Sequence, residues 1–212
     1  NEEKFFLYSV FGGIPFYLLQ VDATSPIHEN IQRLIVPEGS LLENEIRLQL
    51  KTELAKEENA NYVLEKIATG VGKYSDLASS FPGSNGKISH TLGKLEGMSL
   101  IERDSPINHS NNHRYVICDN LLDFYYTYIF RRATTRNIMT PDQFCEAMVL
   151  PHLEAEYLPR KFEQVAKEYL VRCNRAKKFS PPLLAVGRYV YNDKANRKNG
   201  EFDVVARTDD GD

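Results

Sequence analysis

The stretch SNGKISHTLGKLEGMSLIER, residues 84–103, decides the fold, because its apolar residues repeat at helical spacing. Three of them form the predicted buried face: Ile88, Leu92 and Leu95. Four polar residues are predicted to point outward: Lys87, His90, Thr91 and Lys94. Gly97 follows the last apolar residue and can adopt the positive φ angle that commonly ends a helix. The stretch therefore predicts an amphipathic helix that leads into an extended segment.

The segments on either side of this helix predict a winged helix-turn-helix over residues 59–118. NANYVLEKIATG, residues 59–70, has helical apolar spacing and a glycine at its end. SDLASSF, residues 75–81, predicts a short second helix, and the Pro-Gly pair after it predicts the turn. After the third helix, LIERDSP and HRYVICD predict two strands joined by a polar loop, the wing. The third helix then has the position of a DNA recognition helix.

Two functional hypotheses follow from this prediction. In the first, the chain is a DNA-binding module. Lys87, His90 and Lys94 enter the major groove, and Arg114 beside the wing contacts a phosphate. In the second, the chain is a protein-interaction or regulatory module that does not bind DNA. Charge leaves both open, because five Lys and Arg barely outnumber four Asp and Glu between Lys73 and Arg114.

The residues before the winged helix predict a small bundle of helices. Gly12 and the glycine after it permit a sharp bend, and Pro26 suits the first turn of a further helix. Ser40 with Glu43 three residues later predicts a capping box. A free-standing bundle of this size would be marginally stable, so we expect it to pack on the winged helix or on another domain.

The residues after the wing predict more helices and then an antiparallel pair of strands. NLLDFYYTYIFRR, residues 120–132, follows an Asp119 cap. Its aromatic side chains beside arginines suit stacking of single-stranded nucleic acid, but aromatics at helical spacing favour core packing. Between Arg160 and Lys198, basic residues outnumber acids, which is typical either of phosphate contact or of a solvated surface. LLAVGRYVYND and GEFDVVART predict the two strands.

Several motifs occur in the order found in a known protein family. They are GGIPFYL, LEKIATG with LGKLEGMSLIERDSP, YVICDNLLDFYYTYIF, FEQVAKEYL and EFDVVA. In this order they resemble the part of the archaeal-type AAA+ ATPases that lies downstream of the P-loop, and they cover nearly the whole chain. The resemblance implies an ATPase core, then a helical lid, a winged helix and a C-terminal domain similar to restriction endonucleases.

The resemblance divides the chain into three segments. These are a helical lid-like segment at 1–58, the winged helix-turn-helix at 59–118, and a helical connector with a truncated restriction-endonuclease-like α/β domain at 119–212. The expected fold class is therefore mainly α with α+β parts. ATP and Mg are expected for the parent protein but no cofactor for this fragment, because GSNGK at Gly83–Lys87 lacks P-loop spacing. The missing ATPase core and DNA are the candidate partners.

The nuclease resemblance also implies a metal site. In such sites a Glu from a helix and an Asp at a strand end hold a divalent cation that activates water. The resemblance puts Glu163 and Asp203 in these two positions, whereas the alternative is that both are ordinary surface acids. The Glu-x-Lys of a third strand does not appear before Asp212, so no catalytic set is complete. We therefore expect neither ATPase nor nuclease turnover from these residues alone.

The composition is that of a soluble protein, with 42% hydrophobic residues and a formal net charge of -3. No apolar run is long enough to cross a membrane, and the sequence does not begin with methionine, which suggests a fragment. Three widely spaced cysteines argue against disulfides, so a cytoplasmic location is expected. His109, His113 and Cys118 have one metal-like spacing, but no second cysteine is close, so zinc is not expected.

Overall fold

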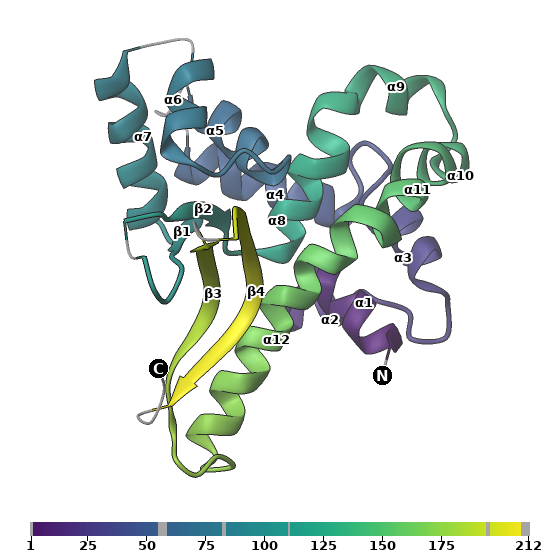
Figure 1. The fold of residues 1–212 in the computed structure, drawn as a ribbon. Helices are drawn as coiled ribbons and strands as arrows, with labels where there is room; N and C mark the ends of the chain where they lie inside the picture. Colours follow the sequence, from purple (N-terminus) through teal and green to yellow (C-terminus); the bar gives the residue numbers. More distant parts are fainter. Residues whose placement is uncertain (1, 55–58, 82–83, 110, 194–195, 209–212) are drawn as a thin grey trace. The chain divides into compact units, whose positions relative to one another are not determined.

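The computed structural model describes residues 2–54, 59–81, 84–109, 111–193 and 196–208. The fold is mixed α+β, with many helices and two antiparallel sheets of two strands each. Figure 1 shows these helices and strands with their labels. The chain divides into two compact units. Unit 1 contains residues 1–102 and 115–158, and unit 2 contains residues 103–114 and 159–212. Each unit combines two separate stretches of the chain. The three consecutive segments expected from the sequence are a different kind of division, and they stay a prediction.

Unit 1 begins with α1 (Glu2–Phe11), α2 (Pro15–Leu18), α3 (Ile27–Leu34) and α4 (Leu41–Glu53). Gly12 follows α1 with a φ of 67°, so the predicted bend is confirmed. The expected capping box is wrong, since the Ser40 hydroxyl forms no cap hydrogen bond. The Glu43 carboxylate instead accepts from the backbone N–H of Gly39 at 2.8 Å and from Arg136 at 3.1 Å. This buried acid is held by a residue 93 positions away, which local sequence does not indicate.

Three further helices and two short strands follow in the predicted order: α5 (Ala60–Ala68), α6 (Tyr74–Ser80), α7 (Asn85–Gly97), β1 (Ile101–Asp104) and β2 (Arg114–Ile117). The predicted apolar face of α7 is buried. Thr91 is buried as well, contrary to the prediction, because it lies one turn from both Ile88 and Leu95 on the same side of the helix. The positive φ falls at Ser99 (57°), whereas Gly97 remains within the helix.

An irregular helical stretch completes unit 1: α8 (Asn120–Phe124), η1 (Tyr125–Ile129), η2 (Phe130–Arg132), α9 (Ala133–Ile138), α10 (Pro141–Phe144), η3 (Cys145–Val149), α11 (Leu150–His152) and η4 (Leu153–Tyr157). Asp119 caps α8 by accepting from the backbone N–H of Leu122 at 2.8 Å. Phe124, Tyr125 and Tyr128 are buried, so the core-packing interpretation of these aromatics is confirmed. The large hydrophobic cluster of the described residues lies entirely in unit 1.

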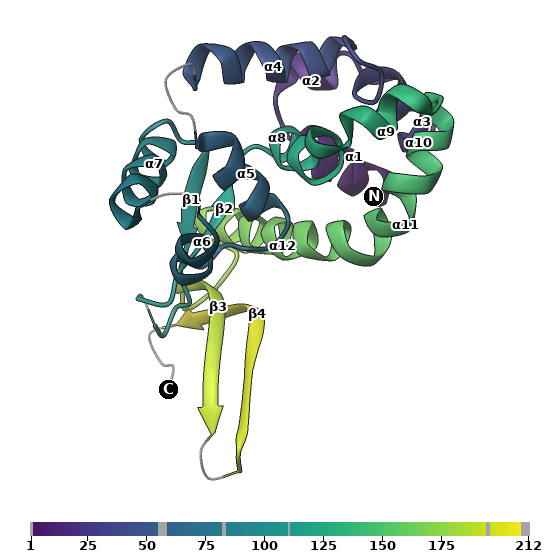
Figure 2. The same ribbon diagram turned by 90° about the horizontal axis from the view of Figure 1, so that it is seen from above.

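Unit 2 contains most of α12 (Leu158–Arg175), the antiparallel hairpin of β3 (Leu183–Asp193) and β4 (Lys198–Thr208), and the segment 103–114. Figure 2 shows the hairpin as a long two-stranded ribbon. The segment 103–114 covers one edge of β3: the Ile107 N–H donates to Arg188 O at 2.8 Å, and the Asn108 amide bonds both backbone groups of Val190. An exposed strand edge is a template for unwanted pairing, and this segment shields it.

The interior of unit 2 differs from that of unit 1. Among its described residues, Pro106 and Cys173 are the only apolar side chains that are buried, whereas the charged Lys161 and Arg188 are each only 4% exposed. Polar contacts therefore hold a large share of this unit together.

None of the helices that the structure describes combines the length and the apolar composition needed to cross a membrane.

Candidate functional site

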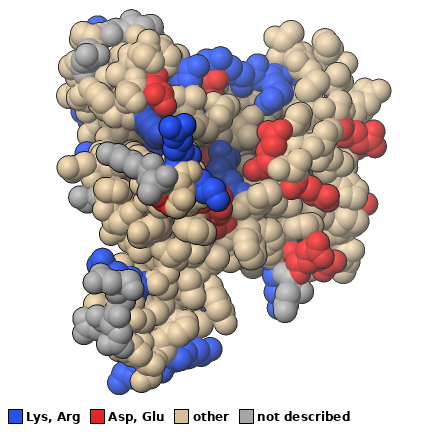
Figure 3. Space-filling view, viewed as in Figure 1, with Lys and Arg blue, Asp and Glu red and all other residues tan. Residues whose placement is uncertain are grey.

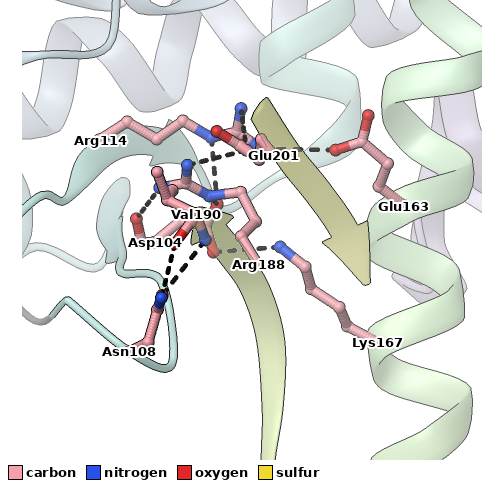
Figure 4. A network of polar contacts seen from close by, with 8 residues as sticks. All are labelled: Asp104, Asn108, Arg114, Glu163, Lys167, Arg188, Val190 and Glu201. Carbon is pink, nitrogen blue, oxygen red and sulfur yellow. Dashed lines mark hydrogen bonds and ion pairs between the residues drawn. The ribbon is translucent and has the colours of Figure 1, made fainter. Parts of the chain in front are cut away.

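Unit 2 contains a network of six charged side chains, which Figure 4 shows from close by. Its members are Asp104, Arg114, Glu163, Lys167, Arg188 and Glu201. They come from the ends of β1 and β2, from two positions one turn apart on α12, and from β3 and β4. Three carboxylates thus meet three cations, and the network is balanced in charge.

Asp104 is the centre of this network. Its carboxylate accepts from Arg188 Nε at 2.7 Å, Arg114 Nε at 3.0 Å and Lys167 Nζ at 3.1 Å. Burial of the carboxylate would raise its pKa, but the neighbouring cations, Lys167 first among them, outweigh burial and lower the pKa of Asp104. Asp104 therefore stays ionised in the folded chain down to a lower pH than an ordinary aspartate.

Arg188 is the most deeply buried cation of the network, with 5% of its side chain exposed. Besides the Nε contact, its Nη2 donates to the backbone oxygen of Asp104 at 2.7 Å and its Nη1 donates to Glu201 Oε1 at 2.9 Å. All three guanidinium nitrogens therefore have oxygen partners. Buried charge is tolerated in proteins when it is paired and hydrogen-bonded in this way.

Of the two predicted metal ligands, Glu163 and Asp203, the second lies close enough for its charge to act on the first. The pKa of Glu163 is raised, first by burial and then by the negative charge of Asp203. Glu163 Oε2 also accepts from Arg114 Nη2 at 3.4 Å, so a cation already faces this carboxylate. Within the part of the chain that the structure describes, no group of three or more His, Cys, Asp and Glu side chains could hold a metal ion. The metal role of Glu163 and Asp203 therefore stays a prediction.

The sequence did not point to four members of the network: Asp104, Lys167, Arg188 and Glu201. They are 10 to 84 positions from their partners, so no local motif connects them. The one available signal was Arg188 itself, a charged residue inside the otherwise apolar run LLAVGRYVY of a predicted strand. The network fixes the segment 103–114 to the hairpin and to α12, which is a structural role.

The predicted DNA-contacting residues are divided between the two units. Lys87, His90 and Lys94 are all exposed on α7 in unit 1. Their spacing of three and four residues puts them on the helix face opposite the buried apolar stripe. Arg114 belongs to unit 2, where Asp104 and Glu163 already bind its guanidinium. A phosphate contact by Arg114 would have to compete with these two carboxylates.

Charge is distributed unequally between the units. Unit 1 has twelve Lys and Arg against twenty Asp and Glu, whereas unit 2 has fourteen Lys and Arg against nine Asp and Glu. Figure 3 shows Lys and Arg around the ends of the hairpin and of α12. Unit 2 is therefore basic, although the net charge of the whole chain is -3. Positive charge of this kind attracts polyanions at moderate salt concentration.

Comparisons with known proteins find one family model and one relative that are similar to parts of this chain or to nearly all of it. The family model described as "Archaea bacterial proteins of unknown function" matches residues 125–212. An uncharacterized protein of Methanocaldococcus jannaschii is 27% identical over 211 residues, which is 98% of this chain and 45% of that protein. The chain thus spans less than half the length of this curated relative. No solved structure matches the chain, and neither description states an activity.

Proposed function

We propose that the chain is a nucleic-acid-binding part of an AAA+-type ATP-binding protein, and that the exposed face of α7 binds duplex DNA. In this proposal residues 59–118 are a winged helix-turn-helix with α7 as the recognition helix. The observation that carries it is the composition of the exposed face of α7, which presents Lys87, His90 and Lys94. The only acid in α7 is Glu96, which is half-buried near the end of the helix.

The remaining exposed residues of α7 support a close approach to a partner. Ser89 and Gly93 lie between the basic residues on the exposed face. A Cβ atom added to Gly93 would meet nothing within 4 Å, so the packing of the chain does not require a glycine there. Small residues let a helix backbone come near the floor of the major groove, while Lys and His reach base edges or phosphates.

In this proposal the segment 103–114 does not supply the main phosphate contacts. Arg114 is bound by Asp104 and Glu163, and Asn108 is bound to the backbone of Val190. A wing that contacts DNA needs its basic side chains available. Arg114 is therefore assigned to anchoring the segment, and α7 carries the DNA contacts.

The nuclease-like character of unit 2 is part of the same proposal. A helix that carries Glu163 packs in one unit with a hairpin that carries Asp203, as a restriction-endonuclease-like domain would require. Because the two carboxylates need further ligands, the 212-residue chain by itself is expected to leave a supercoiled plasmid intact with magnesium or manganese. Cleavage that Glu163→Gln abolishes would contradict this expectation and assign a metal to these residues.

The test of DNA binding compares charge reversals on α7 with charge reversals elsewhere in unit 1. Lys87→Glu with Lys94→Glu changes the α7 face, and Lys4→Glu with Lys51→Glu makes the same charge change at exposed positions of α1 and α4. Fluorescence anisotropy with a labelled duplex would be recorded between about 50 and 200 mM salt. We expect the α7 double variant to lose most binding and to lower the salt slope by about 2, and the control to bind nearly as the native chain does.

Two results would contradict DNA binding by α7. One is the absence of binding to any duplex at about 50 mM salt. The other is equal loss of binding in the α7 variant and the control variant, because this would mean that only total charge matters. Loss confined to the α7 variant supports the proposal.

A second candidate function is a protein-interaction module that couples an ATPase core to a partner without DNA. The observation that favours it is the apolar surface around α2, where Phe16 is 45% and Leu19 is 81% exposed. Exposed apolar groups of this size commonly mark interfaces. If this candidate is correct, the ATPase portion of the parent protein, added separately, should bind the native chain and not the Phe16→Ser, Leu19→Ser variant. Equal binding of both would remove this candidate.

A further inference from the structure

The β3–β4 hairpin carries aromatic side chains on one of its faces. Tyr189 and Phe202 are register partners, and Tyr191 is the partner of Gly200. Because alternate residues of a strand point to the same face, Tyr189, Tyr191 and Phe202 lie together. The ring centroids of Tyr191 and Phe202 are 5.5 Å apart, with an interplanar angle of 34°. The three rings form one group, here called the aromatic face.

Gly200 makes room for this arrangement. A Cβ atom at Gly200 would lie 2.6 Å from Tyr191 Oη and 2.8 Å from two of its ring carbons. The Tyr191 ring therefore lies directly over the backbone of β4, and a larger residue at position 200 would displace it. The position of Tyr191 beside Phe202 depends on this glycine.

The aromatic face remains accessible, whereas the opposite face of the hairpin is in use. Phe202 is 56% exposed and Tyr189 is 38% exposed. On the opposite face, Arg188 and Glu201 belong to the charged network. The aromatic residues of α8 and η1 are buried, so exposure of aromatic rings distinguishes the hairpin from the core. Exposed neighbouring rings are a stacking surface for a flat, unsaturated partner.

The charge around the hairpin indicates the chemistry of that partner. Exposed cations flank the aromatic face at both ends of β4: Arg197, Lys198 and Arg207. By sequence, unit 2 has fourteen Lys and Arg against nine Asp and Glu, and the charged network contains three of each kind. Phe202 and Lys198 are four residues apart on one strand, a separation of about 13 Å. Stacking rings flanked by exposed cations suit a partner with planar bases and a polyanionic backbone.

From these observations we infer that the aromatic face of the β3–β4 hairpin binds single-stranded nucleic acid. Bases stack on Tyr189, Tyr191 and Phe202, and the phosphates lie against the flanking cations. A duplex does not fit this face, because its bases are already stacked on one another inside the helix. An apolar protein surface would bury the rings but would offer no negative charge to the flanking cations. This site differs from α7, and neither proposal requires the other.

The experiment measures binding of the 212-residue chain to a labelled oligothymidylate of about 15 nucleotides, by fluorescence anisotropy. A blunt duplex of the same length serves as competitor. Phe202→Ala and Tyr189→Ala each remove one stacking ring, whereas Tyr189→Phe keeps the ring. Phe162→Ala is the matched control, because it removes an aromatic ring that is 62% exposed on α12 of the same unit. Thermal melting followed by circular dichroism verifies that each variant is folded.

We expect each alanine variant of the aromatic face to weaken binding of the single strand by about 5- to 100-fold. Tyr189→Phe and Phe162→Ala should stay within about twofold of the native chain, and the Lys87→Glu, Lys94→Glu variant should bind the single strand as the native chain does. Binding should also weaken as salt rises, since phosphate contacts release counterions.

Several outcomes would overturn the inference. These are no binding of the single strand at about 50 mM salt, unchanged binding by folded Phe202→Ala, or an equal loss in Phe162→Ala. A dimer in light scattering that Phe202→Ala converts to a monomer would assign the aromatic face to a second copy of this chain. Failure of α7 variants to affect duplex binding would leave this inference untouched, so the two proposals are tested separately.

Discussion

Replacing Asp104 by asparagine is expected to loosen unit 2 selectively. The substitution keeps the shape of the side chain but removes the charge that faces Arg188, Arg114 and Lys167. Arg188 would then be a buried cation with Glu201 as its remaining carboxylate partner. Because the unit has few buried apolar side chains, little else compensates for the loss.

The expected size follows from the exposure of the partners. Removing one member of a fully buried ion pair costs about 3 to 5 kcal/mol, mainly because the other charge stays unpaired. The side chain of Arg188 is 5% exposed, but those of Lys167 and Arg114 are 21% and 35% exposed, so water replaces part of their interaction. The Arg188 contact with Glu201 also remains. We therefore expect a loss of about 2 to 4 kcal/mol in the stability of unit 2.

Hydrogen exchange read by mass spectrometry is the appropriate measurement, because a chain with two units need not unfold in one step. A loss of 2 to 4 kcal/mol corresponds to exchange that is about 30- to 1000-fold faster in β3 and β4. Peptides from α5 in unit 1 should exchange at the native rate. Asp203→Asn is the matched control: it neutralises an exposed acid of the same hairpin and should change exchange by less than about threefold.

Two results would refute this reasoning. Exchange in the hairpin that changes less than threefold in Asp104→Asn would mean that the network contributes little. Equal acceleration in α5 and in the hairpin would mean that the two units unfold together. Acceleration confined to unit 2 in Asp104→Asn, and absent in Asp203→Asn, is the expected pattern.

Three further expectations concern pH and a second buried ion pair. Because the pKa of Asp104 is lowered in the folded chain, its carboxylate stabilises unit 2 fully above the ordinary pKa near 4, and this stabilisation is lost as pH falls through the lowered pKa. When the protection of hairpin amides from hydrogen exchange is measured as pH falls, it should therefore decrease less steeply in Asp104→Asn than in the native chain. Because burial raises the pKa of Glu163, its carboxyl group contributes most to stability below its ordinary pKa near 4 and loses this contribution as pH rises through the raised pKa. Urea unfolding should show that Glu163→Gln gains stability relative to the native chain as pH rises above that ordinary value, and a difference that does not change with pH would contradict this. In unit 1, Arg136→Ala would leave the buried Glu43 carboxylate without its 3.1 Å partner, and the free energy of unfolding measured with heat or urea should fall by about 3 kcal/mol. Arg47→Ala removes a 54% exposed cation that lies 3.6 Å from the same carboxylate. It should lower the free energy of unfolding by less than about 1 kcal/mol.

Local patterns in the sequence predicted the order of elements well. The apolar spacing in α7 and the Asp119 cap both depend on residues within one or two turns, and both are confirmed. The strand pattern also predicted β3 and β4, because alternating apolar residues and a polar turn define a hairpin by themselves. These features need no knowledge of the rest of the chain.

Features that depend on distant residues were not predictable in this way. Glu43 has the spacing of a capping residue, but it pairs with Arg136, which lies 93 positions later. The polar loop after β1 has the composition of a free wing, but Asp104 and Asn108 are bound to residues 82 to 84 positions away on β3. Thr91 has the polarity of a surface residue and the position of a core residue, and packing decided its burial. In each case a tertiary contact overrode the local pattern.

The discontinuous make-up of unit 2 determines how the protein can be divided for experiments. The matched family region begins at residue 125, after the segment 103–114 has already passed through unit 2. A fragment cut at that boundary would lack Asp104 and Asn108. Arg188 would then lose its main counterion, and the edge of β3 that Asn108 covers would lose its hydrogen-bond partner at Val190. Such a fragment is expected to aggregate through strand-to-strand association.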